Sequence, residues 1–120
     1  MPNITMAGSY VEVIIPSGYA LSNAFLCSPY LIGQVWVHNS WTQPAALGIF
    51  CSNLENGYYV PLFDDNGEFA QLTYVHISGY IVGFDLQPMI WAKIWSKAPG
   101  VRDPASVLQV DDAHILITMK

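Results

Sequence analysis

The sequence predicts an all-β protein, a single antiparallel β-sandwich or jelly roll of about eight strands. Short runs rich in β-branched and aromatic residues recur along the chain, and Gly, Pro, Asn or Asp residues separate them. No window carries an apolar stripe with the 3.6-residue period of a helix. The chain has 120 residues, which is enough for one domain with a core and too few for two ordinary domains.

The candidate strands in the first half of the chain each end at residues that disfavour a strand. YVEVII stops at Pro16 and Gly18, and LIGQVWVHN stops before a loop that contains Pro44. YYVPLF contains Pro61, which indicates an edge strand or a bulge. The run 19–27 is the weakest of the set. The candidate ranges are 10–15, 19–27, 31–39, 46–52 and 58–63.

The second half of the chain gives clearer alternation. In IWAKIWS the side chains of Trp91, Lys93 and Trp95 fall on one face of a strand. EFAQLTYVHI alternates with one slip, and a long loop with two prolines precedes the last apolar run. The candidate ranges here are 68–77, 80–86, 90–96 and 114–119.

Residues 1–9 are expected to form an N-terminal arm, and residues 10–120 the sandwich domain. The stretch MPNITMAGS has small residues and few apolar anchors, so it is a candidate to dock on a neighbouring molecule. It has neither a basic n-region nor a continuous apolar h-region. We therefore expect no signal peptide, and synthesis in a cytosol.

The composition points to association with other protein molecules. The chain is 52% hydrophobic and 11% charged, whereas a typical soluble domain is about 25% charged. No apolar run approaches the roughly 20 residues of a membrane span, so we expect no membrane partner. The net charge is −5 with only four Lys and Arg residues, which argues against nucleic acid as a partner. Burial against other protein copies explains the sparse charge better.

An acidic window at 52–72 holds Glu55, Asp64, Asp65 and Glu68. Asn56-Gly57 and Asn66-Gly67 are suited to turns with positive φ, and Asp and Asn stabilise such turns through their own backbone. The ligand register of a calcium loop is absent. Adjacent carboxylates on a hairpin turn are solvated, unlike the pair of a glycosidase. The window is therefore interpreted as the turns of a β-meander.

Other chemistry finds no support in the sequence. His38, His76 and His114 lie far apart, and the spacing of Cys27 and Cys51 fits no zinc pattern. The two cysteines are interpreted as buried reduced thiols, with a disulfide as the less favoured alternative. There is no G-x-S-x-G elbow and no Gly-rich phosphate loop. We predict no catalytic, cofactor-binding or metal-binding residues and a protein that is not an enzyme.

The aromatic residues leave two interpretations open. Tryptophans in strands pack in a core or interface, or they stack on sugars. Trp41 differs because it lies in a loop, where it is either exposed or caps one end of the sandwich. The predicted interaction surface consists of Trp41, Tyr58, Tyr59 and Trp91.

The order of several weak motifs resembles a known family. A Trp-containing loop precedes small residues at Ala45-Ala46, and a Ser-x-x-x-x-Gly turn runs from Ser52 to Gly57. Leu62-Phe63-Asp64 with Gly67, then Lys93-Ile94-Trp95-Ser96, then Pro104 to Gln109 follow in order. This order resembles small β-sandwich virion structural proteins that are encoded near the capsid and portal genes of tailed bacteriophages, of the head decoration or cement type.

That resemblance implies a structural role without chemistry. The expected function is a capsid decoration or cement protein of the virion that stabilises the head through protein–protein contacts. Its expected partners are the major capsid protein or other virion proteins and further copies of itself, as a closed homo-oligomer such as a trimer. The alternative is a carbohydrate-binding module or an adhesion domain associated with the neck, tail or fibre.

Overall fold

The computed structural model describes residues 9–28, 32–37, 41–42, 45–63, 67–69, 80–85, 90–100 and 102–119. Within these residues, no helix has the length and apolarity that crossing a membrane requires. The strands in this part of the chain are β1 (Ser9–Ile15), β2 (Phe25–Leu26), β3 (Ile32–Val37), β4 (Ala46–Ser52), β5 (Val60–Pro61), β6 (Tyr80–Asp85), β7 (Trp91–Lys97) and β8 (Ala113–Met119).

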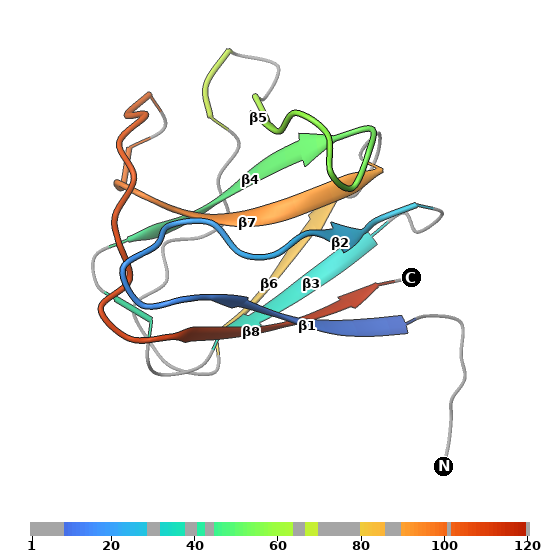
Figure 1. The fold of residues 1–120 in the computed structure, drawn as a ribbon, viewed down its shortest axis with the longest axis horizontal. Coiled ribbons are helices and arrows are strands. Elements are labelled where there is room, and N and C mark those ends of the chain that lie inside the picture. The colour runs from blue at the N-terminus through green and yellow to red at the C-terminus, as the bar shows by residue number, and fades with distance from the viewer. Residues whose placement is uncertain are drawn as a thin grey trace.

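The described strands form two antiparallel sheets of four strands each (Figure 1). Sheet A has the order β1-β8-β3-β6, and sheet B has the order β2-β7-β4-β5. Strand β8 pairs with β1 along its whole length, and its other side pairs with β3. In sheet B, β7 lies between β2 and β4. The all-β prediction with antiparallel sheets is confirmed.

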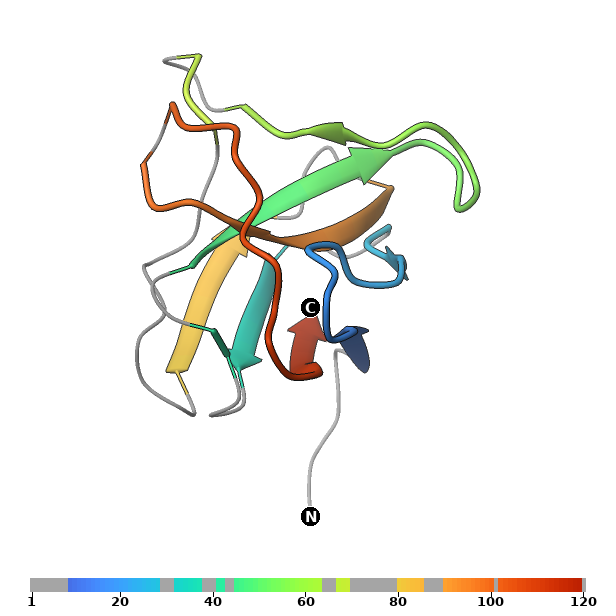
Figure 2. The same cartoon turned by 60° about the vertical axis from the view of Figure 1, so that its left-hand side comes forward.

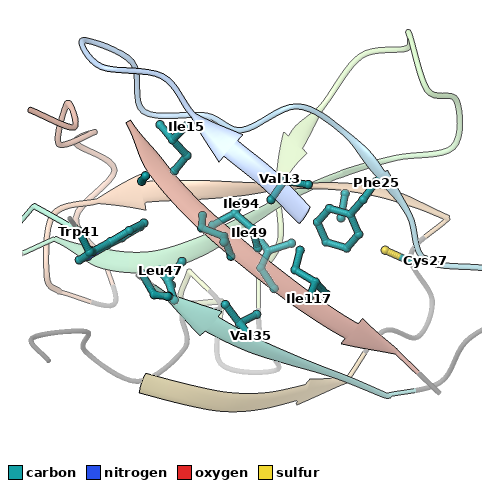
Figure 3. Close-up of a cluster of buried hydrophobic side chains, with 14 of the residues drawn as sticks. Val13, Ile15, Phe25, Cys27, Val35, Trp41, Leu47, Ile49, Ile94 and Ile117 are labelled. Carbon is teal, nitrogen blue, oxygen red and sulfur yellow. The ribbon is translucent and has the colours of Figure 1, made fainter. Parts of the chain in front are cut away.

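The core fills the space between the two sheets (Figure 3). Strand residues alternate between the two faces of a sheet, so every second side chain enters the core. From sheet A, Val13, Val35 and Ile117 are fully buried, and sheet B contributes Leu47 and Ile94. The face of each sheet that points away from this core is its outer face.

The predicted strand ranges agree with the structure where the apolar run is long. The range 46–52 matches β4, and 10–15 lacks only Ser9, which belongs to β1 rather than to the expected arm. The predictions 19–27 and 58–63 were too long, because only β2 and β5 form ladder there. Pro61 has no N–H to donate, which limits β5 to the edge of sheet B. The range 68–77 lies mostly outside the described residues, as do residues 1–8 of the arm.

Trp41 belongs to the core, so its assignment to an interaction surface was wrong. Its side chain is 5% exposed and closes one end of the core (Figure 3). The indole Nε1 donates a hydrogen bond of 3.0 Å to the carbonyl of Ala45. A buried indole needs such a partner. The other expectation for this residue, that it caps an end of the sandwich, is confirmed.

The two Asn-Gly turns use glycine for different reasons. Gly67 has φ of 74°, as the turn prediction required. Gly57 is not among the glycines with positive φ, so that prediction was wrong. A Cβ at Gly57 would lie 2.8 Å from Ser52 Oγ. Close packing against the end of β4, rather than a left-handed backbone, therefore explains a glycine at position 57.

Gln109 is a buried polar residue that joins distant segments of the chain. Its side chain is 1% exposed; Nε2 donates to Ser96 Oγ at 2.8 Å, and Oε1 accepts from the Thr42 N–H at 2.9 Å. Its main chain accepts from Gly18 at 2.7 Å and donates to Tyr19 at 2.9 Å. Gln109 thus connects β7, the loop after β3, the turn after β1 and the segment that leads to β8.

Replacing Gln109 should destabilise the protein more than a change at an exposed neighbour. Gln109→Ala leaves the partly buried Thr42 N–H without its acceptor and removes the donor to Ser96 Oγ. We expect the free energy of unfolding to fall by about 2–3 kcal/mol in urea titrations. Leu108→Ala, at a side chain that is 59% exposed, should change it by less than about 0.5 kcal/mol. Equal effects of the two changes would contradict the proposed role of Gln109.

Candidate interaction face

The outer face of sheet A is broad and carries few charges. The residues that alternate with the buried positions of β1, β3 and β8 point outward. Tyr10 is 73% exposed and Trp36 is 38% exposed. The described outward positions are Tyr10, Glu12, Ile14, Gln34, Trp36, His114, Leu116 and Thr118.

A hollow lies in the middle of this face. It has a volume of about 360 Å³ and is lined by Gln34, Trp36, Leu116 and Thr118. The strand register explains the grouping, because Gln34 pairs with Thr118, and Trp36 pairs with Leu116. On the other side of β3, Gln34 pairs with Gly83. A glycine has no side chain that could fill the hollow from that side. The described lining of the hollow therefore combines an aromatic and an aliphatic side chain with one amide and one hydroxyl group.

Among the described outward side chains of sheet A, charge is confined to one contact between neighbouring strands. His114 Nδ1 lies 3.9 Å from Glu12 Oε2, and both side chains are about half exposed. Such an exposed contact contributes little to stability, on the order of 0–1 kcal/mol, and then only when the imidazole is protonated. The rest of the described outward residues on sheet A are neutral. Binding of an apolar partner here therefore requires little desolvation of charge.

The outer face of sheet B is different because the chain itself covers the part around Trp95. Trp95 points outward from β7 and yet is only 3% exposed. The ring of Phe50 meets it edge-on at 4.9 Å, and the ring of Phe69 does so at 5.5 Å. Phe63 stacks on Phe69 at 4.8 Å. These rings form a second, smaller apolar cluster on the outside of sheet B.

Lys97 lies fully buried beside this cluster. Its Nζ donates hydrogen bonds of 2.7 Å to the carbonyls of Ala98 and Gly100. The ammonium group also lies 5.6 Å from the ring of Phe69 and 5.7 Å from that of Trp95. Burial lowers the pKa of Lys97, and Asp103 acts in the opposite direction. The carbonyls and rings replace water around the ammonium group, so Lys97 holds the loop after β7 in place.

The remaining predicted surface residues do not form one surface. Tyr58 is 87% exposed, beside a second hollow of about 280 Å³. Tyr59 is half-buried: its hydroxyl donates to the Glu55 carbonyl at 2.7 Å, and Lys93 Nζ lies 4.5 Å above its ring. Burial raises the pKa of Tyr59, and the charge of Glu55 adds to the shift. Trp91 is half-buried in β7. Of the four predicted surface residues, only Tyr58 has a largely exposed side chain.

The acidic window shows no shared site among its described members. Arg102 Nε lies 3.3 Å from Glu68 Oε2, so this carboxylate pairs with a guanidinium. Glu55 is exposed, and its carbonyl, not its carboxylate, is used by Tyr59. Asp64, Asp65, His38 and His76 lie outside the described residues. In the described part of the chain, no three His, Cys, Asp or Glu side chains come together in a way that could hold a metal ion.

The two cysteines lie on opposite sides of β7. Phe25 and Cys51 both pair with Ala92, from β2 and β4, and the Cys27 N–H donates to Ile90 at 2.7 Å. Two strand spacings separate their Cα atoms by about 10 Å, beyond the reach of a disulfide. Both thiols are free. Burial raises the pKa of Cys27 to about 12, and Cys51 adds to the shift.

Sequence reasoning missed the hollow on sheet A. A signal was present, because Gln34 and Trp36 alternate with the buried Val35 and Val37. The same alternation in β8 places Leu116 outward, although neighbouring positions are isoleucines. Trp36 was grouped with the packing tryptophans because strand sequence alone does not tell which face of a sheet is covered.

Comparison with known proteins shows a likeness in structure and none in sequence. No family model matches the chain, and no curated protein sequence matches it. Among solved structures, the crystal structure of SPBc2 prophage-derived protein YomS is similar, with a TM-score of 0.54 and 11% sequence identity over 98% of each chain. At this identity the likeness establishes a shared fold. The family expected from the motif order stays a prediction.

The fit of Trp95 against β4 depends on Gly48. A Cβ at position 48 would lie 2.6 Å from Trp95 Cε3 and 2.9 Å from Lys97 Cδ. Gly48→Ala should therefore lower the free energy of unfolding by about 1–3 kcal/mol in urea titrations. In a Trp95→Leu background the same change should cost about 1 kcal/mol less, because the indole is gone. Identical costs in the two backgrounds would contradict this packing.

The Cys27 thiol should make stability fall with pH. Its pKa is raised from an ordinary value of 9.0 to about 12, so the unfolded chain loses this proton first as pH rises. The contribution is intact below pH 9 and is lost between 9 and about 12. From pH 8 to 10 the protein should lose about 1.4 kcal/mol more than Cys27→Ala does in urea titrations. Parallel losses in the two proteins would contradict burial of the thiol.

Proposed function

We propose that this chain is a non-enzymatic structural protein of a bacteriophage virion, a capsid decoration or cement protein made in the cytoplasm of the bacterial host. Its outer face of sheet A binds the major capsid protein or another virion protein, and it associates with further copies of itself. It uses no cofactor. The fold in this proposal is a jelly roll of about eight strands, which the strand order of the two sheets supports.

The observation that carries this proposal is the outer face of sheet A, whose described residues are aromatic or neutral apart from Glu12 and His114. On sheet B the outward Trp95 is 3% exposed, packed against the rings of Phe50 and Phe69, whereas on sheet A Tyr10 is 73% and Trp36 is 38% exposed. Aromatic side chains dominate the binding energy of protein interfaces. Burial of such a face contributes about 25 cal/mol per Å² before the costs of association.

Two further points support a virion role. The fold is shared with YomS, which its title describes as derived from the SPBc2 prophage. The motif order from Ser52 to Gln109 resembles head decoration proteins of tailed phages. Repetition over a particle surface would also convert weak single contacts into strong total binding. Modest affinity per copy is therefore enough for this role.

Binding to particles should depend on Trp36. Trp36→Ala should weaken binding to purified particles of the encoding phage by about 30-fold, because a central aromatic contact is lost. Tyr58→Ala is the matched control, since Tyr58 is exposed in the connection between β4 and β5, away from sheet A. Co-sedimentation with particles measures both variants, and mass spectrometry of purified particles tests for the native protein. Absence from particles, or equal effects of the two changes, would contradict the proposal.

Carbohydrate binding is the second candidate, and the hollow at Trp36 favours it. An indole face beside the Gln34 amide and the Thr118 hydroxyl offers stacking and hydrogen bonds to a hexose. Such a module would serve adhesion at the neck, tail or fibre. A glycan array with the purified protein distinguishes the two functions. Binding that is lost in Trp36→Ala supports the carbohydrate function, and an array without binders removes it.

A further inference from the structure

The free edge of β1 is the starting point for an inference about self-association. Strand β1 borders sheet A, and only one of its sides pairs with a strand in the described part of the chain (Figures 1 and 2). Natural edge strands are usually blunted by proline, lysine or a bulge. SYVEVII contains no proline, lysine or glycine, and Glu12 is its one charged residue. Apart from Glu12, the residues of β1 therefore do not oppose pairing with a further strand.

The direction of the main-chain groups along β1 follows from one hydrogen bond. The Ile14 N–H donates to Asn23 Oδ1 at 2.9 Å, away from β8. Because N–H and C=O groups alternate in direction along a strand, those of Tyr10 and Glu12 also point away from β8. No hydrogen bond from the described residues reaches these groups of Tyr10 or Glu12. They are available to a strand from another molecule.

Asn23 limits the stretch that another strand can use. Its side chain occupies the edge at Ile14, so the open part of the strand is residues 9–13. The centre of this stretch is Val11. Two identical strands that meet antiparallel about Val11 place Tyr10 of each copy opposite Glu12 of the other. The open stretch is therefore self-complementary under a two-fold rotation.

We propose that two copies of the chain pair antiparallel through β1, with the two-fold axis at Val11. The neighbouring registers are less favourable. An axis at Glu12 sets two carboxylates opposite each other and runs into Asn23. An axis at Tyr10 leaves fewer residues of β1 to pair. This inference rests on the proposed function and specifies its self-association. The contact forms a dimer, whereas a trimer was expected from the sequence.

Pairing in this register joins the two A sheets into one continuous sheet. The outer faces of the two copies then lie side by side, with Tyr10 of each copy near the junction. Tyr10 loses exposure and gains a neighbour in Glu12 of the second copy. The proposed binding face is thereby doubled in area without any change within either copy.

The test compares two substitutions at one position. Glu12→Pro removes the outward N–H that each copy would donate, and an edge strand tolerates proline. Glu12→Ala removes the same side chain and keeps the N–H. Sedimentation velocity should show a dimer for the native protein and for Glu12→Ala. For Glu12→Pro the dimer dissociation constant should rise at least about 30-fold, because two hydrogen bonds are lost.

A cross-link gives a second readout that does not depend on the proline variant. Val11 of each copy would form a directly opposed pair, with Cβ atoms about 5 Å apart. Val11→Cys should form an intermolecular disulfide under mild oxidation, identified by peptide mass. Thr118→Cys is the control, because its two copies would lie about 14 Å apart across the joined strands. A native protein that is monomeric at all concentrations overturns the inference.

A dimer that Glu12→Pro leaves intact, together with no disulfide in Val11→Cys, also overturns the pairing. The outcomes separate this inference from the virion role. A monomer that still binds particles removes the β1 pair and leaves the virion role standing. A β1 dimer that is absent from particles supports the β1 pair and removes the virion role.

Discussion

The hydrogen bonds of the buried Gln109 side chain hold the segment between β7 and β8 in its path. This segment leaves sheet B, crosses one end of the sandwich and enters sheet A (Figure 2). Ser96 assists, because its hydroxyl donates to the Val107 carbonyl at 2.6 Å while it accepts from Gln109. A buried polar group is stable only when its partners are in place. The network therefore fixes where β8 begins, and β8 in turn separates β1 from β3.

The same crossing segment makes the two outer faces unequal. Near its start, the carbonyls of Ala98 and Gly100 hold the buried Lys97, and Ser106 Oγ accepts from the Trp95 indole at 2.9 Å. The outward Trp95 of sheet B is thus packed against other residues of the same chain. On sheet A, Tyr10 is largely exposed, and the described residues that line the hollow carry no charge. The two outer faces therefore differ in how their aromatic residues are packed.

The sequence predicted those features that depend on local pattern. The long apolar run of β4 and the alternation in β7 identify strands because burial on one face needs a period of two. Trp41 was ambiguous, because a loop tryptophan reaches the core only if a distant carbonyl and cavity receive it. The burial of Lys97 was not predictable, since it depends on carbonyls and rings that the fold brings together. Gln109 was noticed only as part of a motif, and its hydrogen-bond partners explain why a glutamine stands there.

The predicted interaction residues were chosen because they are aromatic. In the folded chain they differ in how much of each side chain is exposed. Tyr58 is exposed, Tyr59 and Trp91 are half-buried, and Trp41 is in the core. Trp36 was passed over, although its position opposite Leu116 places it at the centre of the open face. Which face of a sheet is covered depends on loops far away in sequence. The alternation in a strand therefore predicts which side chains share a face of the sheet. The packing of the connecting segments decides whether that face is exposed to solvent.

Hydroxyl-radical footprinting of the free protein and of particles that carry it tests most directly whether the outer face of sheet A is the binding face. The oxidation rates of Trp36 and Leu116 on sheet A are compared with those of Tyr58 and Leu54, which are exposed elsewhere. We predict that Trp36 and Leu116 become protected in the particle while Tyr58 and Leu54 keep their rates. Protection of Tyr58 with an unchanged rate at Trp36 would contradict the account.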